Sequence, residues 1–421
     1  MTYRKYNINN IELHLINTTK FKTNQISINF IDQIKEEDIE FRALLPNILK
    51  SRTSELTKLE INKKLQELFG SILYCGVSKI GLISDIDFSL KSINGKLLDI
   101  NILEDSFKLL SNIIYNPYIK DEGFDNEIVE LEKRLLIEEI ENLKNNKVTY
   151  SINKLYSYMF KGEIASLNIN GKIENIKKIT NKDLYKYYKE NFLNNKIIIS
   201  VCGNLNYFDI KKLIIKYFKN LNNTSNYQIL DLEEKKIKEF TKIEEKDEIT
   251  QAKLNIGYRT HIRRNDDLYY PMYLANAILG SYMHSKLFTQ VREKEGLAYY
   301  ISSFYDPFKG ILVIYAGIEY KNLNKTLEII NKQIDDIKNG NITKNELEIT
   351  KKQIINDLLE LEDSQSSILN RTIGISLLNN KFSLRDRINN INKVTIDDIR
   401  NAFSKIEEDT IFVLRGNEDE I

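Results

Sequence analysis

Residues 285–299 read Ser285-Lys-Leu-Phe-Thr-Gln-Val-Arg-Glu-Lys-Glu-Gly-Leu-Ala-Tyr299. The apolar residues recur at helical spacing as far as Gly296, a residue type that commonly ends a helix. The apolar run that follows predicts a strand, and the turn residues at 307–310 predict a hairpin. Arg292 would lie in the last helical turn and Tyr299 near the start of the strand. Such a helix-to-strand junction could aim a guanidinium group and a phenol at one spot.

The chain contains an internal repeat. Residues 173–184 and 388–399 share the pattern Ile-x-x-Ile-x-Lys-(Ile or Val)-Thr-x-x-Asp-(Leu or Ile), 215 residues apart. In both copies Thr precedes an apolar-periodic segment and Asp stands three residues after it, which is typical of a helix that begins with a capping box. The predicted helices span 182–191 and 397–405, and each precedes a β-branched run that ends in Gly, at 197–203 and 411–416.

Two further matches occur upstream of these segments. Long charged helices are predicted over 124–144 and 343–362, and in the first the apolar positions include Leu131, Leu135 and Ile137. Alternating strands are predicted at Ile11-Leu13-Leu15 and Ala252-Leu254-Ile256. Four matches in one order indicate a duplication. We therefore expect an N-terminal domain over 1–225, a charged surface connector over 226–245 and a C-terminal domain over 246–421, each an α+β sheet with helices on one face.

Composition excludes several classes of protein. The 421 residues include 61 Lys plus Arg and 60 Asp plus Glu, so the formal net charge of +1 gives no electrostatic reason to bind nucleic acid or an anionic membrane. Two cysteines, Cys75 and Cys202, exclude a disulfide scaffold and a thiolate zinc cluster. We find no signal peptide and no apolar run of the ~18–20 residues that span a bilayer. We expect a soluble, cytoplasmic protein.

The segment at residues 287–299 closely resembles the second-domain signature of the pitrilysin or insulinase family of zinc peptidases, which includes mitochondrial processing peptidase. The family pattern Leu-Phe-x-x-Val-Arg-Glu-Lys-x-Gly-Leu-Ala-Tyr is intact here. The duplicated halves fit the family as well, so the resemblance covers essentially the whole chain. It implies two homologous α/β roll domains that form a clam-shaped chamber.

The zinc motif of the family has degenerated in this chain. Family enzymes hold zinc through His-x-x-Glu-His on a first-domain helix and a further Glu on a later helix. The resemblance places Ala43 and Asn47 at the two His positions and Pro46 at the general base, and it places Glu139 at the later Glu. The chain has three His, at 14, 261 and 284, and none has another His three or four residues away. We expect no metal in this chain, and we expect Glu132, Glu138 and Glu139 to be solvated helix charges.

In the family, the residues that correspond to Arg292 and Tyr299 reach into the zinc site and donate hydrogen bonds to the peptide or to the oxyanion. A chain with these donors and no metal can complete an active site carried by another chain. The resemblance therefore implies the non-zinc subunit of a heterodimeric metallopeptidase, whose homologous partner binds the zinc and whose substrate is an extended peptide. It also makes peptide maturation, such as leader-peptide removal, the expected pathway, and no independent peptidase activity is expected.

Two other functions stay open. The chain could be an inactive scaffold or peptide-binding subunit, in which case Arg292 is an exposed cation near a helix C-terminus and Tyr299 is a half-buried strand aromatic. It could also be an independent hydrolase that uses residues outside the family motif. Substitution of Arg292 or Tyr299 separates the first alternative from catalysis in trans, and peptide cleavage by the single chain in a chelator would indicate the second.

Overall fold

A computed structural model describes residues 1–97, 100–218, 240–378 and 383–417. The chain forms two compact units, each built from three segments. Unit 1 comprises Met1–Glu141, Leu167–Leu230 and Leu361–Phe382. Unit 2 comprises Asn142–Ser166, Asp231–Glu360 and Ser383–Ile421. None of the helices in the described residues combines the length and the apolar character that a membrane span needs.

Unit 1 is built on a six-stranded sheet with the order β1-β2-β8-β3-β5-β4. Neighbouring strands are antiparallel except β2 and β8, which are parallel. The strands are β1 (Thr2–Ile8), β2 (Ile11–Asn17), β3 (Thr23–Gln33), β4 (Ile72–Ile80), β5 (Ile83–Ile93) and β8 (Lys196–Gly203). The strands alternate apolar and polar residues, so one face of the sheet is apolar and the other carries many polar side chains.

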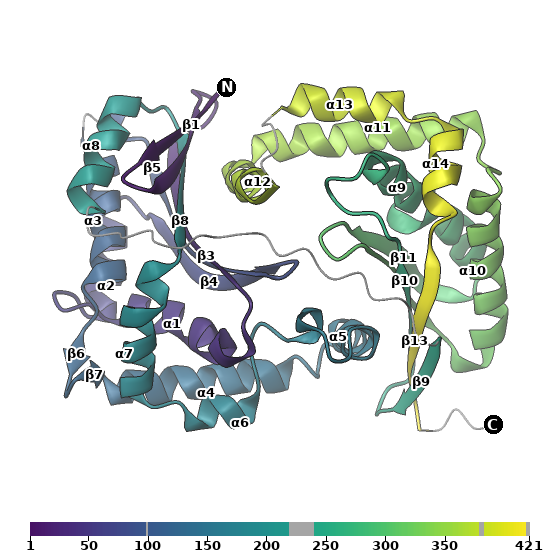
Figure 1. Ribbon diagram of the computed structural model, residues 1–421, viewed down its shortest axis with the longest axis horizontal. Helices are drawn as coiled ribbons and strands as arrows, with labels where there is room; N and C mark the ends of the chain where they lie inside the picture. The colour runs from purple at the N-terminus through teal and green to yellow at the C-terminus, as the bar shows by residue number, and fades with distance from the viewer. Residues whose placement is uncertain (98–99, 219–239, 379–382, 418–421) are drawn as a thin grey trace. The chain divides into compact units, whose positions relative to one another are not determined.

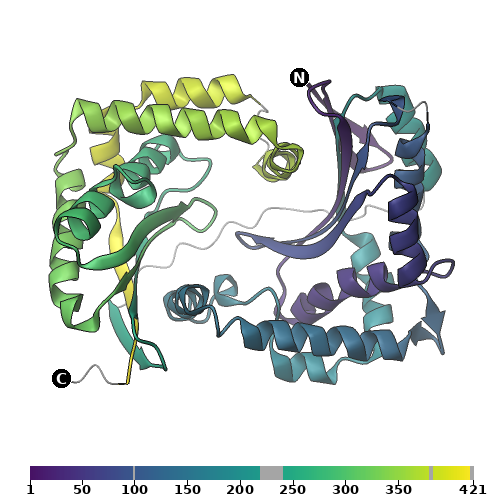
Figure 2. The same cartoon turned by 180° about the vertical axis from the view of Figure 1, so that it is seen from behind.

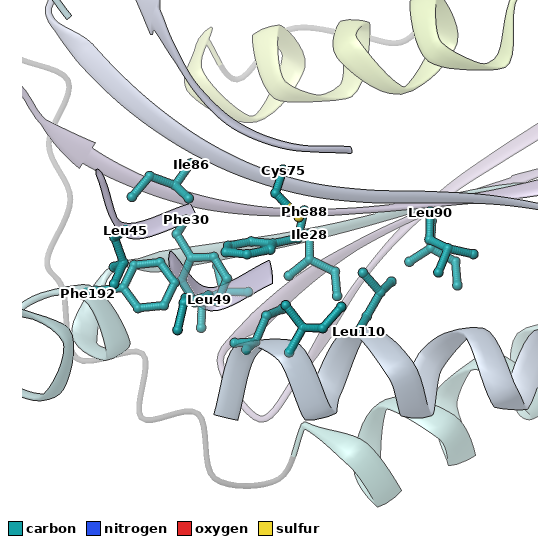
Figure 3. Close-up of a cluster of buried hydrophobic side chains, with 14 of the residues drawn as sticks. Ile28, Phe30, Leu45, Leu49, Cys75, Ile86, Phe88, Leu90, Leu110 and Phe192 are labelled. Carbon is teal, nitrogen blue, oxygen red and sulfur yellow. The ribbon is translucent and has the colours of Figure 1, made fainter. Parts of the chain in front are cut away.

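Helices cover the apolar face of this sheet. Figure 3 shows part of the resulting core, where Phe30, Phe88 and Phe192 gather on the helix side of the strands. The ring centroids of Phe30 and Phe192 are 4.2 Å apart. The helices of the unit include α1 (Ile39–Ser51), α2 (Lys58–Glu67), α3 (Ile102–Tyr115), α4 (Asn126–Asn142), α6 (Ile173–Lys178), α7 (Asn181–Glu190) and α8 (Tyr207–Tyr217), and a short hairpin joins β6 (Ile119–Lys120) to β7 (Gly123–Phe124).

Unit 2 repeats this plan on a five-stranded sheet with the order β11-β12-β10-β13-β9. Here β13 and β9 are the parallel pair, and the other pairs are antiparallel. The strands are β9 (Thr241–Lys246), β10 (Ala252–Arg259), β11 (Ala298–Asp306), β12 (Ile311–Ile318) and β13 (Glu407–Arg415). The helices include α9 (Tyr269–Asn276), the wide-turn helices η5 (Ala277–Ser281) and η6 (Phe288–Lys294), α10 (Leu323–Lys338), α11 (Lys344–Glu360), α13 (Leu384–Lys393) and α14 (Ile396–Phe403).

The duplication predicted from the sequence is visible element by element. Thr180 and Thr395 both cap their helices, α7 and α14, with a complete capping box in which the Asp three residues later takes part. The strands that follow these helices, β8 and β13, occupy corresponding places in the two sheets. The fold class predicted from the sequence, α+β with two similar halves, is confirmed.

The second face of each sheet is covered by a helix from the other half of the sequence. Helix α12 (Gln365–Leu378) packs on β8 and β3 of unit 1, and α5 (Lys147–Met159) packs on β10 and β13 of unit 2. Figure 1 shows the yellow-green α12 beside the first sheet and the blue α5 beside the second, and Figure 2 shows both from behind. The two helices lie in corresponding places in the repeat, so the halves of the sequence have exchanged equivalent elements.

Three expectations about individual elements were wrong. The counterpart of β10 by position in the sheet is β3, not the strand at residues 11–15, which corresponds to β9. Residues 241–245 of the predicted connector belong to β9, and residues 226–239 lie outside the described residues. In α4, Leu131 and Leu135 are exposed, and the side of the helix that packs inward carries Val129, Leu136 and two charged residues.

Candidate functional site in unit 2

Arg292 lies in η6, close to the point where this helix ends. The helix is anchored by Leu287 and Val291, which are fully buried. It ends at Gly296, whose backbone is left-handed with φ of 62°, and the amide of Leu297 donates to the carbonyl of Val291 over 3.0 Å. Arg292 points outward, and its guanidinium carbon lies 4.8 Å from the centre of the Phe288 ring. The helix therefore presents Arg292 to solvent without using it in the core.

Tyr299 is the extra residue of a β-bulge at the start of β11. Ala298 pairs with Ile318 and Tyr300 pairs with Gly317, so Tyr299 has no opposite residue on β12. Bulges of this kind redirect a side chain away from the regular alternation of the strand. The side chain of Tyr299 is 76% exposed. The expectation that Tyr299 could be a half-buried strand aromatic is wrong.

Sequence reasoning missed the residues that support this bulge. Tyr300 lies against Gly317, where an added Cβ would come within 2.4 Å of the Tyr300 ring. The ammonium group of Lys253 lies 5.5 Å from the centre of the same ring, and it donates to Gln251 Oε1 over 2.8 Å. Burial raises the pKa of Tyr300 to about 12 and lowers the pKa of Lys253. Because Gly317 matters through residues that other strands and loops bring against it, Tyr300 and Gln251, no local sequence pattern could have indicated it.

The positions that the resemblance aligns with the zinc motif lie on α1 in unit 1. Ala43 and Pro46 are buried in the core, and Asn47 is half-buried. Ala43 offers a methyl group and Pro46 a ring without a donor, so neither can bind a metal or activate water. One neutral amide does not replace two imidazoles as a zinc ligand set. The residues present do not fit a zinc ion.

The carboxylate that faces α1 belongs to Glu132 and not to Glu139. Glu132, on α4, is 5% exposed, and its Oε1 lies 2.9 Å from the hydroxyl oxygen of Ser51. Glu139 is exposed, and Glu138 lies 3.9 Å from Arg134 at the surface. The expectation that Glu132 is a solvated helix charge is therefore wrong. Among the described residues, no group of three or more His, Cys, Asp or Glu side chains could hold a metal ion.

The three histidines lie in separate places. His14 is buried in the first sheet between Tyr3, whose hydroxyl lies 2.8 Å from Nδ1, and Glu12, whose Oε1 lies 2.7 Å from Nε2. His284 packs against Tyr282 and lies 3.0 Å from the Thr350 hydroxyl. His261 is in the loop after β10. Its Nε2 lies 3.4 Å from a carboxylate oxygen of Glu407.

A second buried acidic site, which sequence reasoning also missed, lies on the polar face of the first sheet. Asp85 and Asp87 are on the same face of β5. Asp85 accepts hydrogen bonds of 3.1 and 3.0 Å from Asn29 Nδ2, and Asp87 accepts one of 2.7 Å from the Ser27 hydroxyl. Burial raises the pKa of each carboxyl group to about 7, and the charge of Asp87 adds to the rise for Asp85.

Comparison with known proteins places this chain among peptidases. A sequence profile described as "Peptidase M16 inactive domain" matches residues 178–354. The chain is 32% identical to the "Probable inactive metalloprotease YmfF" of Bacillus subtilis, over 96% of both chains. It is 27% identical to the "Uncharacterized zinc protease YmxG" of the same organism, over 65% of this chain and 66% of that one. A crystal structure of a conserved protein from Enterococcus faecalis superposes with a TM-score of 0.91 at 29% identity, over all of both chains. The chain belongs to the M16 peptidase family.

Proposed function

We propose that this chain is the non-zinc subunit of a heterodimeric M16 metallopeptidase. It would supply Arg292 and Tyr299 to the active site of a homologous, zinc-binding partner. The observation that carries the proposal is the presentation of two hydrogen-bond donors that the chain itself does not use. Within the described residues, the Arg292 guanidinium makes no hydrogen bond or ion pair and lies over the Phe288 ring, and the Tyr299 hydroxyl makes no hydrogen bond.

The chemistry of the two side chains fits a role at a developing negative charge. A guanidinium group is a cation with five N–H donors, and a phenol hydroxyl donates one hydrogen bond. Donors placed at an oxyanion contribute roughly 3–4 kcal/mol each to transition-state stabilisation in comparable sites. The zinc and the water that attacks the peptide would belong to the partner. The substrate would be an extended peptide, and peptide maturation would be the pathway.

The test uses the chain together with its zinc-binding partner, purified as a complex from the native organism. Arg292→Ala and Tyr299→Phe should each lower kcat by a factor of roughly 10²–10³ while the complex still assembles. Lys294→Ala is the matched control, because Lys294 is an exposed cation of the same helix end. Assembly is checked by size-exclusion chromatography, and kcat by cleavage of a fluorogenic peptide.

The alternative is an inactive scaffold or peptide-binding subunit. Unchanged kcat in both variants, with the complex intact, would favour it and overturn the proposed role. Purification of the chain without any homologous zinc-binding protein would also contradict the heterodimer.

A further inference from the structure

Gly280, in the wide-turn helix η5, lies against both of the elements that present Arg292 and Tyr299. A Cβ added at Gly280 would lie 2.6 Å from the Ser303 hydroxyl oxygen, 2.8 Å from the Ser303 backbone nitrogen and 3.0 Å from Leu287 Cδ1. Ser303 belongs to β11, the strand of Tyr299. Leu287 is the N-cap of η6, the helix of Arg292. The backbones of η5 and β11 thus approach each other more closely than a side chain on Gly280 would allow.

The backbone conformation of Gly280 does not require a glycine. Its φ is not in the left-handed region, and alanine forms helices better than glycine does. What an alanine lacks at this position is space. Ordinary contacts begin at 3.4 Å, so a Cβ placed 2.8 Å from the Ser303 nitrogen needs about 0.6 Å of additional separation. Because that nitrogen is a backbone atom, a change of side-chain rotamer cannot supply the separation.

The segment that follows Gly280 is also attached to α11, through three side-chain contacts. They are the hydrogen bond of 2.6 Å from the Tyr282 hydroxyl to Asp357 Oδ2, the approach of His284 Nε2 to within 3.0 Å of the Thr350 hydroxyl oxygen, and the ion pair of 3.0 Å between Lys286 and Glu346. On the strand side, the Ser302 hydroxyl donates to the carbonyl of Gly280 over 2.9 Å. Because two elements hold the segment, we expect a Cβ on Gly280 to displace β11 or the start of η6.

We propose that Gly280 is a positioning residue for Arg292 and Tyr299, an inference that rests on the proposed function. The helix η6 and the strand β11 follow each other in the chain through the turn at Gly296, and Gly280 is a second point at which both are held. The two points fix the helix relative to the strand, and hence the guanidinium group relative to the phenol. Movement of a catalytic group by about 1 Å can lower a rate about a hundredfold.

The first measurement is structural and needs no partner. Crystal structures of the chain alone should show Arg292 and Tyr299 moved relative to each other in Gly280→Ala by about 0.6 Å, the separation that the added Cβ needs. Gly374→Ala is the matched control, because no described atom lies within 4 Å of the Cβ that it would add in α12. Identical geometry of the two donors in wild type and Gly280→Ala would overturn the proposal.

The second measurement is made on the complex with the zinc-binding partner. Gly280→Ala should lower kcat at least about tenfold and leave KM within about twofold of the wild type, because donors to a developing charge act in the transition state. The loss should disappear when Arg292→Ala and Tyr299→Phe are already present, whereas a general defect in folding would persist in that background.

Ser302→Ala is the second variant, for use if the melting temperature shows that Gly280→Ala does not fold. It removes only the hydrogen bond to the carbonyl of Gly280 and should lower kcat less, with the same dependence on the two donors. A wild-type kcat in whichever variant folds, or an equal loss in the background without both donors, would overturn the positioning role alone. Unchanged kcat in Arg292→Ala and Tyr299→Phe themselves would instead overturn the proposed function, and this inference with it.

Discussion

The hydroxyl oxygen of Ser51 lies 2.9 Å from Oε1 of the buried Glu132, and this contact joins α1 to α4 inside unit 1. The same hydroxyl lies 2.8 Å from the carbonyl oxygen of Asn47, one turn earlier on α1. In a zinc peptidase of this family, α1 would carry the histidine ligands. Here the interior carboxylate has a serine as its partner, so the contact between the helices is structural.

Replacement of Glu132 should therefore destabilise the fold. Glu132→Ala leaves a cavity and removes the hydrogen-bond partner of Ser51, so we expect the free energy of unfolding to fall by about 1–3 kcal/mol. Glu139→Ala, on the exposed side of the same helix, should change it by less than about 0.5 kcal/mol. Urea denaturation followed by circular dichroism measures both. Equal effects would show that Glu132 is not the buried partner.

Asp85 and Asp87 should make stability depend on pH. Their folded-state pKa values are about 7, above the ordinary 3.8, so the folded chain holds protons that the unfolded chain has released. The protonated carboxyl groups contribute their full stabilisation of the folded state below the unfolded pKa of 3.8. This stabilisation is lost as the pH rises through the folded pKa of about 7. From about pH 6 to about pH 8, the wild type should lose roughly 1 kcal/mol more than Asp87→Asn does. Parallel pH profiles of the two proteins would contradict these raised pKa values.

Gly317 should be needed for the position of Tyr300 beside the bulge. An added Cβ would lie 2.4 Å from Tyr300 Cε1, so Gly317→Ala should lower the free energy of unfolding by about 1–3 kcal/mol. Adding Tyr300→Ala should restore part of that loss, because the clashing ring is gone. Gly374→Ala is the control, since nothing lies within 4 Å of the Cβ it would add in α12. If the double variant is no more stable than expected from adding the two single effects, the clash is ruled out.

Gln365 should hold α12 on the first sheet. Its Nε2 donates to the carbonyl of Thr23 over 2.9 Å and to that of Cys202 over 3.0 Å. Gln365→Ala leaves both buried carbonyls short of a donor, and we expect faster hydrogen exchange in β3 and β8 and a loss of about 1–3 kcal/mol. Asn370→Ala, at an exposed position of α12, should leave the exchange of these strands unchanged. Unaltered exchange in both variants would mean that other contacts fix the helix.

Features that depend on residues close together in the sequence were predicted correctly. Features that depend on tertiary contacts could not be predicted. The capping boxes at Thr180 and Thr395 are correct because a cap depends on residues three positions apart. The interior position of Glu132 could not be predicted, because packing against α1 decides which side of α4 is buried. The bulge at Tyr299 gave no signal either, since the sequence around it is an ordinary strand pattern.

The exchange of α5 and α12 bears on the order in which the protein can mature during synthesis. When the ribosome has completed residues 1–218, the first sheet has all six strands, but the helix that covers its polar face ends only at Leu378. Groups that are buried in the folded protein stay exposed to solvent until then. One is Ser200, whose hydroxyl lies 2.6 Å from that of Thr372. Helix α5 in turn emerges early and has no strands to pack on until β10 and β13 follow. Neither unit can therefore complete its packing before most of the chain has been synthesised. We expect the two units to finish folding together after synthesis, and not one after the other during it.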